Sequence, residues 1–256
     1  MADYDLFGNI AVIKSENKTA KQKLMQAKEL LKKPNIKTIL EKATKVKGRL
    51  RTIKTKYITG EKNLIAQYKE NGCLFKFNVE TCYFSPRLSN DRKEIALKIK
   101  KSARVLIMFA GVGPYPIVFY HYSKPKKIIA VEIGKECCRY FKENLKLNKI
   151  SEGKIELIQG DVKKRVNKKL GIFDVIMMAR PNLKDNSLKS ALSISKKNTI
   201  IFYHLFCRDE DLKKEISKLQ KEAQKLKRKI KIKSVKQVGE IAPYKHRYRV
   251  EMKVEK

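Results

Sequence analysis

Two glycines and a glutamate, Gly111, Gly113 and Glu132, have the types and the spacing to hold a nucleotide-like cofactor. They belong to the segment 105–132, whose pattern predicts a strand, a glycine turn, a helix, a second strand and a carboxylate. Glycine lets the backbone turn tightly and approach a ligand where a Cβ would clash. Glu132 follows Gly111 by 21 residues, close to the roughly 20-residue spacing at which an acid meets ribose hydroxyls.

The turn lacks the third glycine of a dinucleotide fingerprint, because position 116 is Pro. Pro114 and Pro116 belong in or before a first helical turn, so close packing against a pyrophosphate is not indicated. We therefore predict an adenosine cofactor without a pyrophosphate, of which S-adenosylmethionine is the commonest candidate. The alternative is a buried glycine turn in some other α/β protein.

The elements after residue 104 alternate between strand and helix, which predicts a mostly parallel, doubly wound sheet with helices on both faces. The expected elements are strands at 105–109, 127–131, 155–159, 173–178 and 199–204, and helices at 135–147 and 212–226. Strands at 230–238 and 247–254 should end the chain as an antiparallel hairpin. Alternation in the last strand predicts that Tyr248, Val250, Met252 and Val254 face inward and that Arg247, Arg249, Glu251 and Lys253 face outward.

The first 83 residues are expected to form a small α+β domain that faces RNA, and 84–256 the larger α/β domain. Strand character is seen at 9–13, 50–60, 64–68 and 73–79, and an amphipathic helix is expected at 21–31. Asn71-Gly72 predicts a tight turn. In the junction, Ser89 is expected to cap a helix that runs to about residue 100.

The chain of 256 residues has 61 Lys and Arg against 26 Asp and Glu, a net charge of +35. Such a charge favours a polyanion, and nucleic acid is the leading partner, although lysine-rich surfaces also arise from thermophily or genome bias. Five cysteines without a CxxC pair and three scattered histidines argue against disulfides and against a metal site. No secretory or membrane segment is apparent, so we expect a cytoplasmic protein. No protein partner is implied.

Several separate segments together resemble one family. They are FGNIAVI at 7–13, GRLRT at 48–52, ENGCLFKFNV at 70–79, FSPRLSNDR at 84–92, MFAGVGP at 108–114, NLKLNK at 144–149 and APYKHRYRV at 242–250. In order and spacing they resemble the archaeal and eukaryotic tRNA methyltransferases that act on guanosine 37, and their aminocarboxypropyl-transferring relatives in wybutosine synthesis. The resemblance implies a class I methyltransferase fold. The methylating branch often has a further N-terminal domain that touches the tRNA elbow, and this sequence begins where that domain would have ended.

The Pro-Arg-Leu element at 86–88 is similar to the methylating branch. The resemblance implies that Arg51 and Arg92 lie over the guanine and the cofactor, and that Asp91 receives the base proton. A turn containing Ala179 and Pro181 would hold the flipped base. The sequence departs from the family pattern at Asp91, Ile107 and Ala179, where the family usually has Glu, Asp and Asn.

Gly160 is a further candidate cofactor residue, and four other residues have two interpretations each. Gly160 and Asp161 follow the third strand of the sheet, where Asp161 would accept from the adenine amino group or cap a helix. Phe109 would pack under the glycine turn or contact adenine. Tyr203 would stack on a base or lie in the core, and Arg87 would hold a phosphate or remain a solvated surface residue.

Three functions follow, in order of preference. The first is methyl transfer from S-adenosylmethionine to N1 of guanosine 37 in tRNA. The second is aminocarboxypropyl transfer from the same cofactor, and the third is a non-catalytic RNA-binding protein of the same fold. A small-molecule methyltransferase is disfavoured by the charge of +35.

Overall fold

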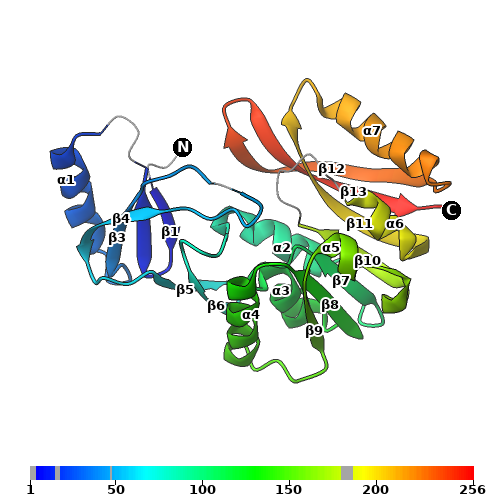
Figure 1. Ribbon diagram of the computed structural model, residues 1–256, viewed down its shortest axis with the longest axis horizontal. Helices are drawn as coiled ribbons and strands as arrows, with labels where there is room; N and C mark the ends of the chain where they lie inside the picture. Colours follow the sequence, from blue (N-terminus) through cyan, green and yellow to red (C-terminus); the bar gives the residue numbers. More distant parts are fainter. Residues whose placement is uncertain (1–3, 15–17, 47, 180–186) are drawn as a thin grey trace.

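The computed structural model describes residues 4–14, 18–46, 48–179 and 187–256 (Figure 1). Its largest element is a seven-stranded sheet with the strand order β12-β13-β11-β10-β7-β8-β9. The strands are β7 (Arg104–Met108), β8 (Lys127–Glu132), β9 (Ile155–Gln159), β10 (Phe173–Met178), β11 (Ser195–Arg208), β12 (Ile230–Ala242) and β13 (Lys245–Val254). β7 to β11 pair in parallel, whereas β13 is antiparallel to both β11 and β12. The predicted doubly wound sheet with a terminal hairpin is confirmed.

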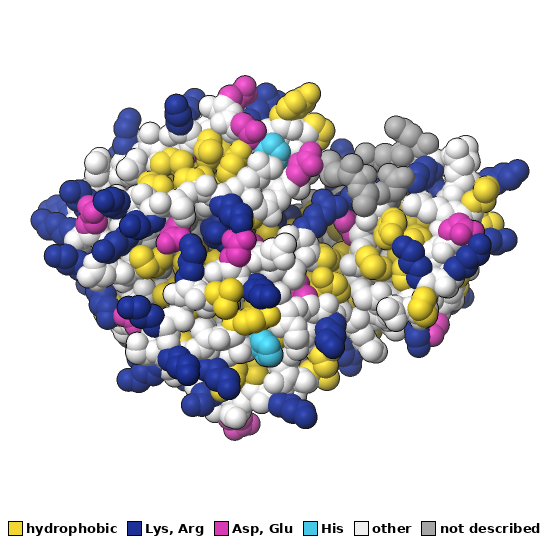
Figure 2. All heavy atoms as spheres, turned by 180° about the vertical axis from the view of Figure 1, so that it is seen from behind, with side chains coloured by type: hydrophobic (Ala, Val, Ile, Leu, Met, Phe, Trp, Pro, Cys, Tyr) yellow, Lys and Arg dark blue, Asp and Glu magenta, His cyan; other side chains and the backbone are white. Residues whose placement is uncertain are grey.

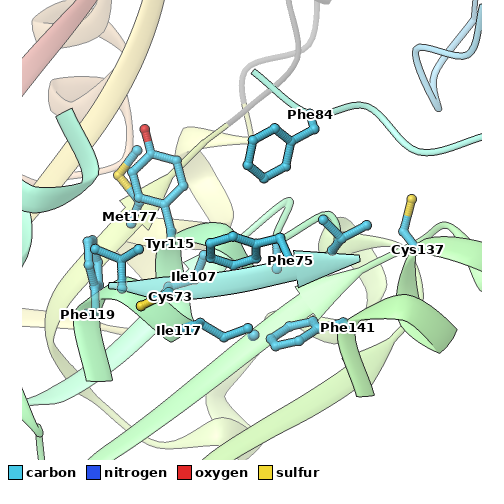
Figure 3. Close-up of a cluster of buried hydrophobic side chains, with 14 of the residues drawn as sticks. Cys73, Phe75, Phe84, Ile107, Tyr115, Ile117, Phe119, Cys137, Phe141 and Met177 are labelled. Atoms are coloured by element: carbon cyan, nitrogen blue, oxygen red, sulfur yellow. The ribbon is translucent and has the colours of Figure 1, made fainter. Parts of the chain in front are cut away.

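Both faces of this sheet are buried, because alternate residues of β7 belong to two different hydrophobic cores. Val105 and Ile107 pack in the first core, and Leu106 and Met108 in the second. The first core contains side chains of α2 (Ser89–Ala96), α3 (Pro114–Ser123) and α4 (Lys135–Leu147), and Figure 3 shows part of it around Ile107. The second contains side chains of α5 (Val162–Arg165), α6 (Leu188–Ser193) and α7 (Leu212–Lys225). An uninterrupted apolar strand is typical of a sheet that is covered on both faces.

The N-terminal part contains a separate four-stranded sheet, in the order β1-β2-β3-β4. Its strands are β1 (Tyr4–Phe7), β2 (Ile10–Ile13), β3 (Thr38–Lys42) and β4 (Thr55–Gly60), and α1 (Ala20–Leu31) packs on it. Thr19 begins α1 with a capping box, because its side chain accepts from Gln22 N and the Gln22 side chain accepts from Thr19 N. The small α+β unit that the sequence predicted is therefore present.

A hairpin of β5 (Ile65–Glu70) and β6 (Cys73–Asn78) links the two sheets. It turns at Asn71-Gly72, where both residues have positive φ (49° and 74°), as the Asn-Gly pair predicts. Asn144 of α4 and its C-cap residue Asn148 hold β6: the Asn144 side chain bonds both backbone groups of Lys76, and the Asn148 side chain both those of Leu74. The hairpin thus packs on the larger sheet's helices, and the proposed division at residue 83 stays a prediction.

The helix predicted to start at a Ser89 cap differs in two details. A short 3₁₀ turn over Pro86–Leu88 precedes it, so that Leu88 takes the N-cap position, and the helix ends at Ala96 rather than near residue 100. β11 runs over Ser195–Arg208 and is longer than the predicted 199–204. Tyr203 consequently lies inside this strand and not at its end.

One prediction about the last strand is wrong. Arg247 and Arg249 were expected to face outward, but they are only 7% and 3% exposed. The reason is that α2 and the segment before it cover this face of β13. The ion pairs Lys98–Glu251 and Lys236–Glu94 connect this region to the hairpin of β12 and β13. Tyr248, Val250, Met252 and Val254 are buried on the opposite face, as predicted.

Two further findings concern the part of the chain that the structure describes. None of its helices is both long and apolar enough to cross a membrane. Within the same residues, no group of His, Cys, Asp and Glu side chains is arranged to hold a metal ion.

Candidate functional site

A pocket with an empty volume of about 930 Å³, partly open to solvent, lies at the carboxyl ends of β7, β8 and β10. The strand order reverses there, because the chain runs from β7 outward to β9 and then continues with β10 on the other side of β7. Such a reversal is where ligands bind in open α/β sheets. The wall also includes residues of the β3–β4 connection, the junction before α2, and β13.

The glycine turn forms the floor of this pocket. Gly111 lines it and has φ of 57°, whereas Gly113 begins α3 with φ of 91°. A Cβ on Gly113 would lie 2.5 Å from the ring of Phe141, so this position needs glycine for helix packing. Phe109 also has positive φ, 64°, and lines the pocket while packing against the second core. The predicted turn is present, and cofactor contact at these residues stays a prediction.

Glu132 joins the glycine turn to the end of β8. Its carboxylate accepts a 2.8 Å hydrogen bond from Gly111 N and a 2.7 Å bond from Gly134 N, and the side chain lines the pocket. Burial raises the pKa of Glu132, against these backbone N–H groups, which favour the charged form. Each carboxylate oxygen has a second lone pair, which can accept from a ribose hydroxyl.

We expect Glu132→Ala to weaken S-adenosylmethionine binding by about 10–100-fold, because a hydrogen bond to a charged group is lost and the turn is released. Isothermal titration calorimetry measures this directly. Glu136→Ala is the matched control, since Glu136 lies in the first turn of α4 and pairs with the exposed Arg139. Equal affinities of the Glu132→Ala protein and the wild type would contradict the assignment.

Three more predicted cofactor residues lie around this end of the pocket. Ala179, directly after β10, lines it. Asp161 caps α5 by accepting from Lys163 N at 2.9 Å, and it also pairs with Arg49, a pocket residue, at 2.8 Å. Gly160 has φ of 145°, and a Cβ there would meet the Arg165 side chain at 2.6 Å. The capping interpretation of Asp161 is thus realised, and its adenine contact stays a prediction.

Arg92 is the guanidinium most completely satisfied by other residues. It makes a bidentate ion pair with Glu70, with both distances 2.5 Å, and donates to Ser85 O at 3.0 Å. The side chains of the pair are only 1% and 2% exposed. Arg92 lines the pocket, but its charge is already balanced by Glu70.

Asp91 is the centre of a buried network behind the pocket. Its carboxylate accepts from the Tyr115 hydroxyl at 2.6 Å and from Arg249 Nη1 at 2.6 Å, and lies 3.2 Å from His204 Nε2. Burial alone would raise the pKa of Asp91, but the hydrogen bonds of His204 and Tyr115 and the charge of Arg249 outweigh it and lower the pKa to about 2. Tyr115 and His204 line the pocket, and Asp91 does not. A ligand in the pocket therefore reaches Asp91 through these two side chains.

His204 is a second candidate proton acceptor, beside Asp91, and it lines the pocket. It is 1% exposed, and burial lowers its pKa against the opposing effect of Asp91, so the imidazole is neutral at pH 7. Because a carboxylate only accepts, His204 donates its Nε2–H to Asp91. A charged imidazolium formed at this position would be stabilised by the adjacent carboxylate.

Arg51 and Arg247 lie on the same wall, on two sides of Tyr83. The Arg51 guanidinium lies 4.0 Å from the centre of the Tyr83 ring, and Arg247 Nη2 donates to the Tyr83 hydroxyl at 3.1 Å. All three line the pocket. Arg51, which was predicted to lie over the guanine, is therefore placed at the pocket, and Arg247 joins it from β13.

Arg87, Tyr203 and Pro181 remain from the predicted site. Arg87 does not line the pocket and pairs with Asp5 of β1 at 2.8 Å. Tyr203 is 2% exposed in the second core, the alternative that the sequence left open for it. Pro181 lies outside the described residues.

Sequence reasoning missed Tyr83, Tyr115, His204, Arg247 and Arg249. Tyr83 directly precedes the FSPRLSNDR segment, and the two arginines are part of APYKHRYRV, so both motifs contained a signal. The alternating pattern of the last strand pointed the arginines toward solvent. Only the contact of α2 with β13 reveals that these residues meet.

Comparisons with known proteins show which family the chain resembles. The family model of the TRM5/TYW2 methyltransferase domain matches residues 66–232. The chain is 38% identical over 156 residues, 58% of its length, to the tRNA (guanine(37)-N(1))/4-demethylwyosine(37)-methyltransferase Taw22 of Nanoarchaeum equitans, covering 49% of that protein. It is 32% identical over 205 residues, 79% of its length, to the tRNA (guanine(37)-N(1))-methyltransferase Trm5b of Pyrococcus abyssi, covering 59% of it.

Solved structures extend the similarity over almost the whole chain. The crystal structure of Trm5b from Pyrococcus abyssi superposes with a TM-score of 0.87 at 26% identity, covering 99% of this chain and 75% of that one. A complex of aTrm5 with tRNALeu gives a TM-score of 0.85 at 27% identity, covering 98% and 72%. The chain spans about half the length of the curated relatives that it matches.

Proposed function

Because the chain belongs to the TRM5/TYW2 methyltransferase family, we propose that it transfers a methyl group from S-adenosylmethionine to N1 of guanosine 37 in tRNA. The observation that carries this proposal is the pocket at the reversal of strand order, with Gly111 held by Glu132 on one side and Arg51 on the other. In this proposal, one part of the pocket binds the cofactor and another part binds the base. Aminocarboxypropyl transfer from the same cofactor is the alternative, since the family includes both branches.

The cofactor half fits an adenosine group without a pyrophosphate. Glu132 would accept from the ribose hydroxyls, and Phe109 and Ala179 would provide apolar contacts on either side. The cofactor supplies an electrophilic methyl group. A solved relative, Trm5 of Methanocaldococcus jannaschii, was crystallised with adenosine, which supports this class of ligand.

The RNA half is supported by charge. Figure 2 shows Lys and Arg side chains spread over the visible face, with few acidic side chains between them, in keeping with the net charge of +35. N1 of guanine is accessible only if the base is splayed from its neighbours, at a cost of a few kcal/mol, and single-stranded loops allow this most easily. We therefore propose a tRNA anticodon loop as the substrate. We also propose that the protein acts in the cytoplasm, where this substrate is found.

The chemistry on the protein side is removal of the guanine N1 proton. His204, neutral and facing the pocket, would take that proton while Asp91 stabilises the imidazolium, so Asp91 contributes through His204 and Tyr115. Arg51 would stabilise the negative charge that develops on guanine O6. When bound, S-adenosylmethionine would supply the methyl group to the deprotonated N1, and the electrons of the carbon–sulfur bond would remain on sulfur.

The test is to incubate the purified protein with S-adenosylmethionine and an unmodified tRNA transcript that carries G37, and to identify the nucleosides by mass spectrometry. We expect 1-methylguanosine from this transcript and none from the matched transcript with A37. An aminocarboxypropyl nucleoside would assign the chain to the other branch. Tight tRNA binding without product would favour a non-catalytic protein, with Ile107, Asp91 and Ala179 as the changed positions.

A further inference from the structure

Of the arginines that line the pocket, Arg51 and Arg247 have no acidic partner among the residues described, whereas Arg49 pairs with Asp161. Arg92 is paired with Glu70, and Arg249 with Asp91 and Glu94. Arg247 is only 7% exposed. The Nε atoms of Arg51 and Arg247 are both buried and have no hydrogen-bond partner. Their contact is instead with Tyr83, which lies between them.

The surroundings of the two groups favour an added negative charge. Burial lowers the pKa of Arg51, and the neighbouring charge of Arg247 lowers it further. Burial alone would raise the pKa of Tyr83, but the charges of Arg247 and Arg51 outweigh it and lower the pKa. Positive charges without a counter-charge, at the buried Arg247 and the partly buried Arg51, are costly, and an anion beside them offsets that cost.

We infer that Arg247 and Tyr83, beside Arg51, form an anion subsite in the wall of the pocket that takes a carboxylate or phosphate group of a bound ligand. Planar guanidinium groups bind both oxyanions in a bidentate manner. The inference rests on the proposed function, because the two sources of the anion are then the carboxylate of S-adenosylmethionine and a phosphate of the tRNA. Arg247 reaches this subsite only because β13 passes behind the junction before α2.

The first experiment measures inorganic phosphate alone, which needs no assumption about the reaction. Phosphate should raise the Tm of the wild type more than that of Arg247→Met, which keeps most of the stem and removes the charge. Lys233→Met is the control for loss of one positive charge, because Lys233 is exposed on β12. The phosphate-induced rise in Tm of Arg247→Lys should lie between the other two values, since lysine keeps the positive charge but lacks the planar guanidinium group. Equal phosphate shifts in the wild type and Arg247→Met would overturn the subsite.

The second experiment identifies the source of the anion. Calorimetry compares S-adenosylmethionine with methylthioadenosine, which lacks the carboxylate, and filter binding measures tRNA. If the subsite takes the carboxylate, Arg247→Met lowers the affinity for S-adenosylmethionine about tenfold and leaves the affinity for methylthioadenosine unchanged. If it takes a phosphate, only tRNA binding falls about tenfold, and more than in Lys233→Met.

Two outcomes of the second experiment oppose the subsite. If Arg247→Met binds S-adenosylmethionine, methylthioadenosine and tRNA as tightly as the wild type does, the subsite is overturned. It is also overturned if the variant loses the same affinity for S-adenosylmethionine and methylthioadenosine, because that result indicates general damage to the pocket. The proposed function fails separately, if the wild type itself binds neither S-adenosylmethionine nor tRNA. The phosphate experiment would still decide the subsite in that case.

Discussion

Replacing Asp91 by Asn is expected to lower kcat for guanosine methylation by about 10²–10⁴-fold, because the general base His204 would lose the carboxylate that stabilises its imidazolium. Asn has the same shape but cannot stabilise an imidazolium at His204, 3.2 Å away. Binding of S-adenosylmethionine should stay within a factor of about three, because Asp91 does not line the pocket. Single-turnover kinetics with a G37 transcript and calorimetry with the cofactor measure the two quantities.

The control for this prediction is Asp209→Asn. Asp209 also has a Tyr and a His partner, Tyr248 and His246, but it lies at the exposed end of β11, with a 66% exposed side chain. Its replacement should leave kcat unchanged. If Asp91→Asn folds normally and retains kcat within about threefold, Asp91 has no part in proton removal. A shift in the pH dependence of kcat in His204→Gln separates a proton-accepting role from a structural one.

Replacing Glu70 by Ala is expected to lower the free energy of unfolding by about 3–5 kcal/mol, which is the usual cost of removing one partner of a buried ion pair. Arg92, which is 1% exposed beside Glu70, would keep only Ser85 O as a hydrogen-bond partner among the described residues. Urea unfolding measures the change, with similar slopes required for a comparison.

The matched control for Glu70 is Glu29→Ala. Glu29 pairs with Lys32 on α1 at 2.7 Å, but the two side chains are 68% and 72% exposed. An exposed pair contributes about 0–1 kcal/mol, so little change is expected. A loss below about 1 kcal/mol for Glu70→Ala would show that Arg92 finds another partner or water, and that the pair does not hold the hairpin to α2.

Local sequence features determined the framework of the molecule. The glycine turn follows from residues that tolerate positive φ, and Gly113 cannot be replaced because Phe141 occupies the space of a Cβ. The buried strand before it follows from an unbroken apolar run, and the hairpin turn from Asn71-Gly72. These signals depend on backbone sterics and on periodicity over a few residues, so they can be read without knowing the fold.

The site could be predicted in part. Gly111, Glu132, Phe109, Ala179 and Arg51 all line one pocket, as motif and resemblance indicated. The surroundings of Asp91 could not be predicted, because its partners come from three other elements: Tyr115 of α3, His204 of β11 and Arg249 of β13. Without these partners, nothing in the sequence indicated that Asp91 lies behind the pocket.

The last strand shows most clearly what only the tertiary structure decided. A period of two residues separates the two faces of β13, and it placed Val250 and Met252 correctly in the core. It contains no information on what covers the other face. There α2 and the junction lie over Arg247 and Arg249, so charges expected in water became buried groups of the site. Long-range packing, which brings together residues more than 150 positions apart, made that choice.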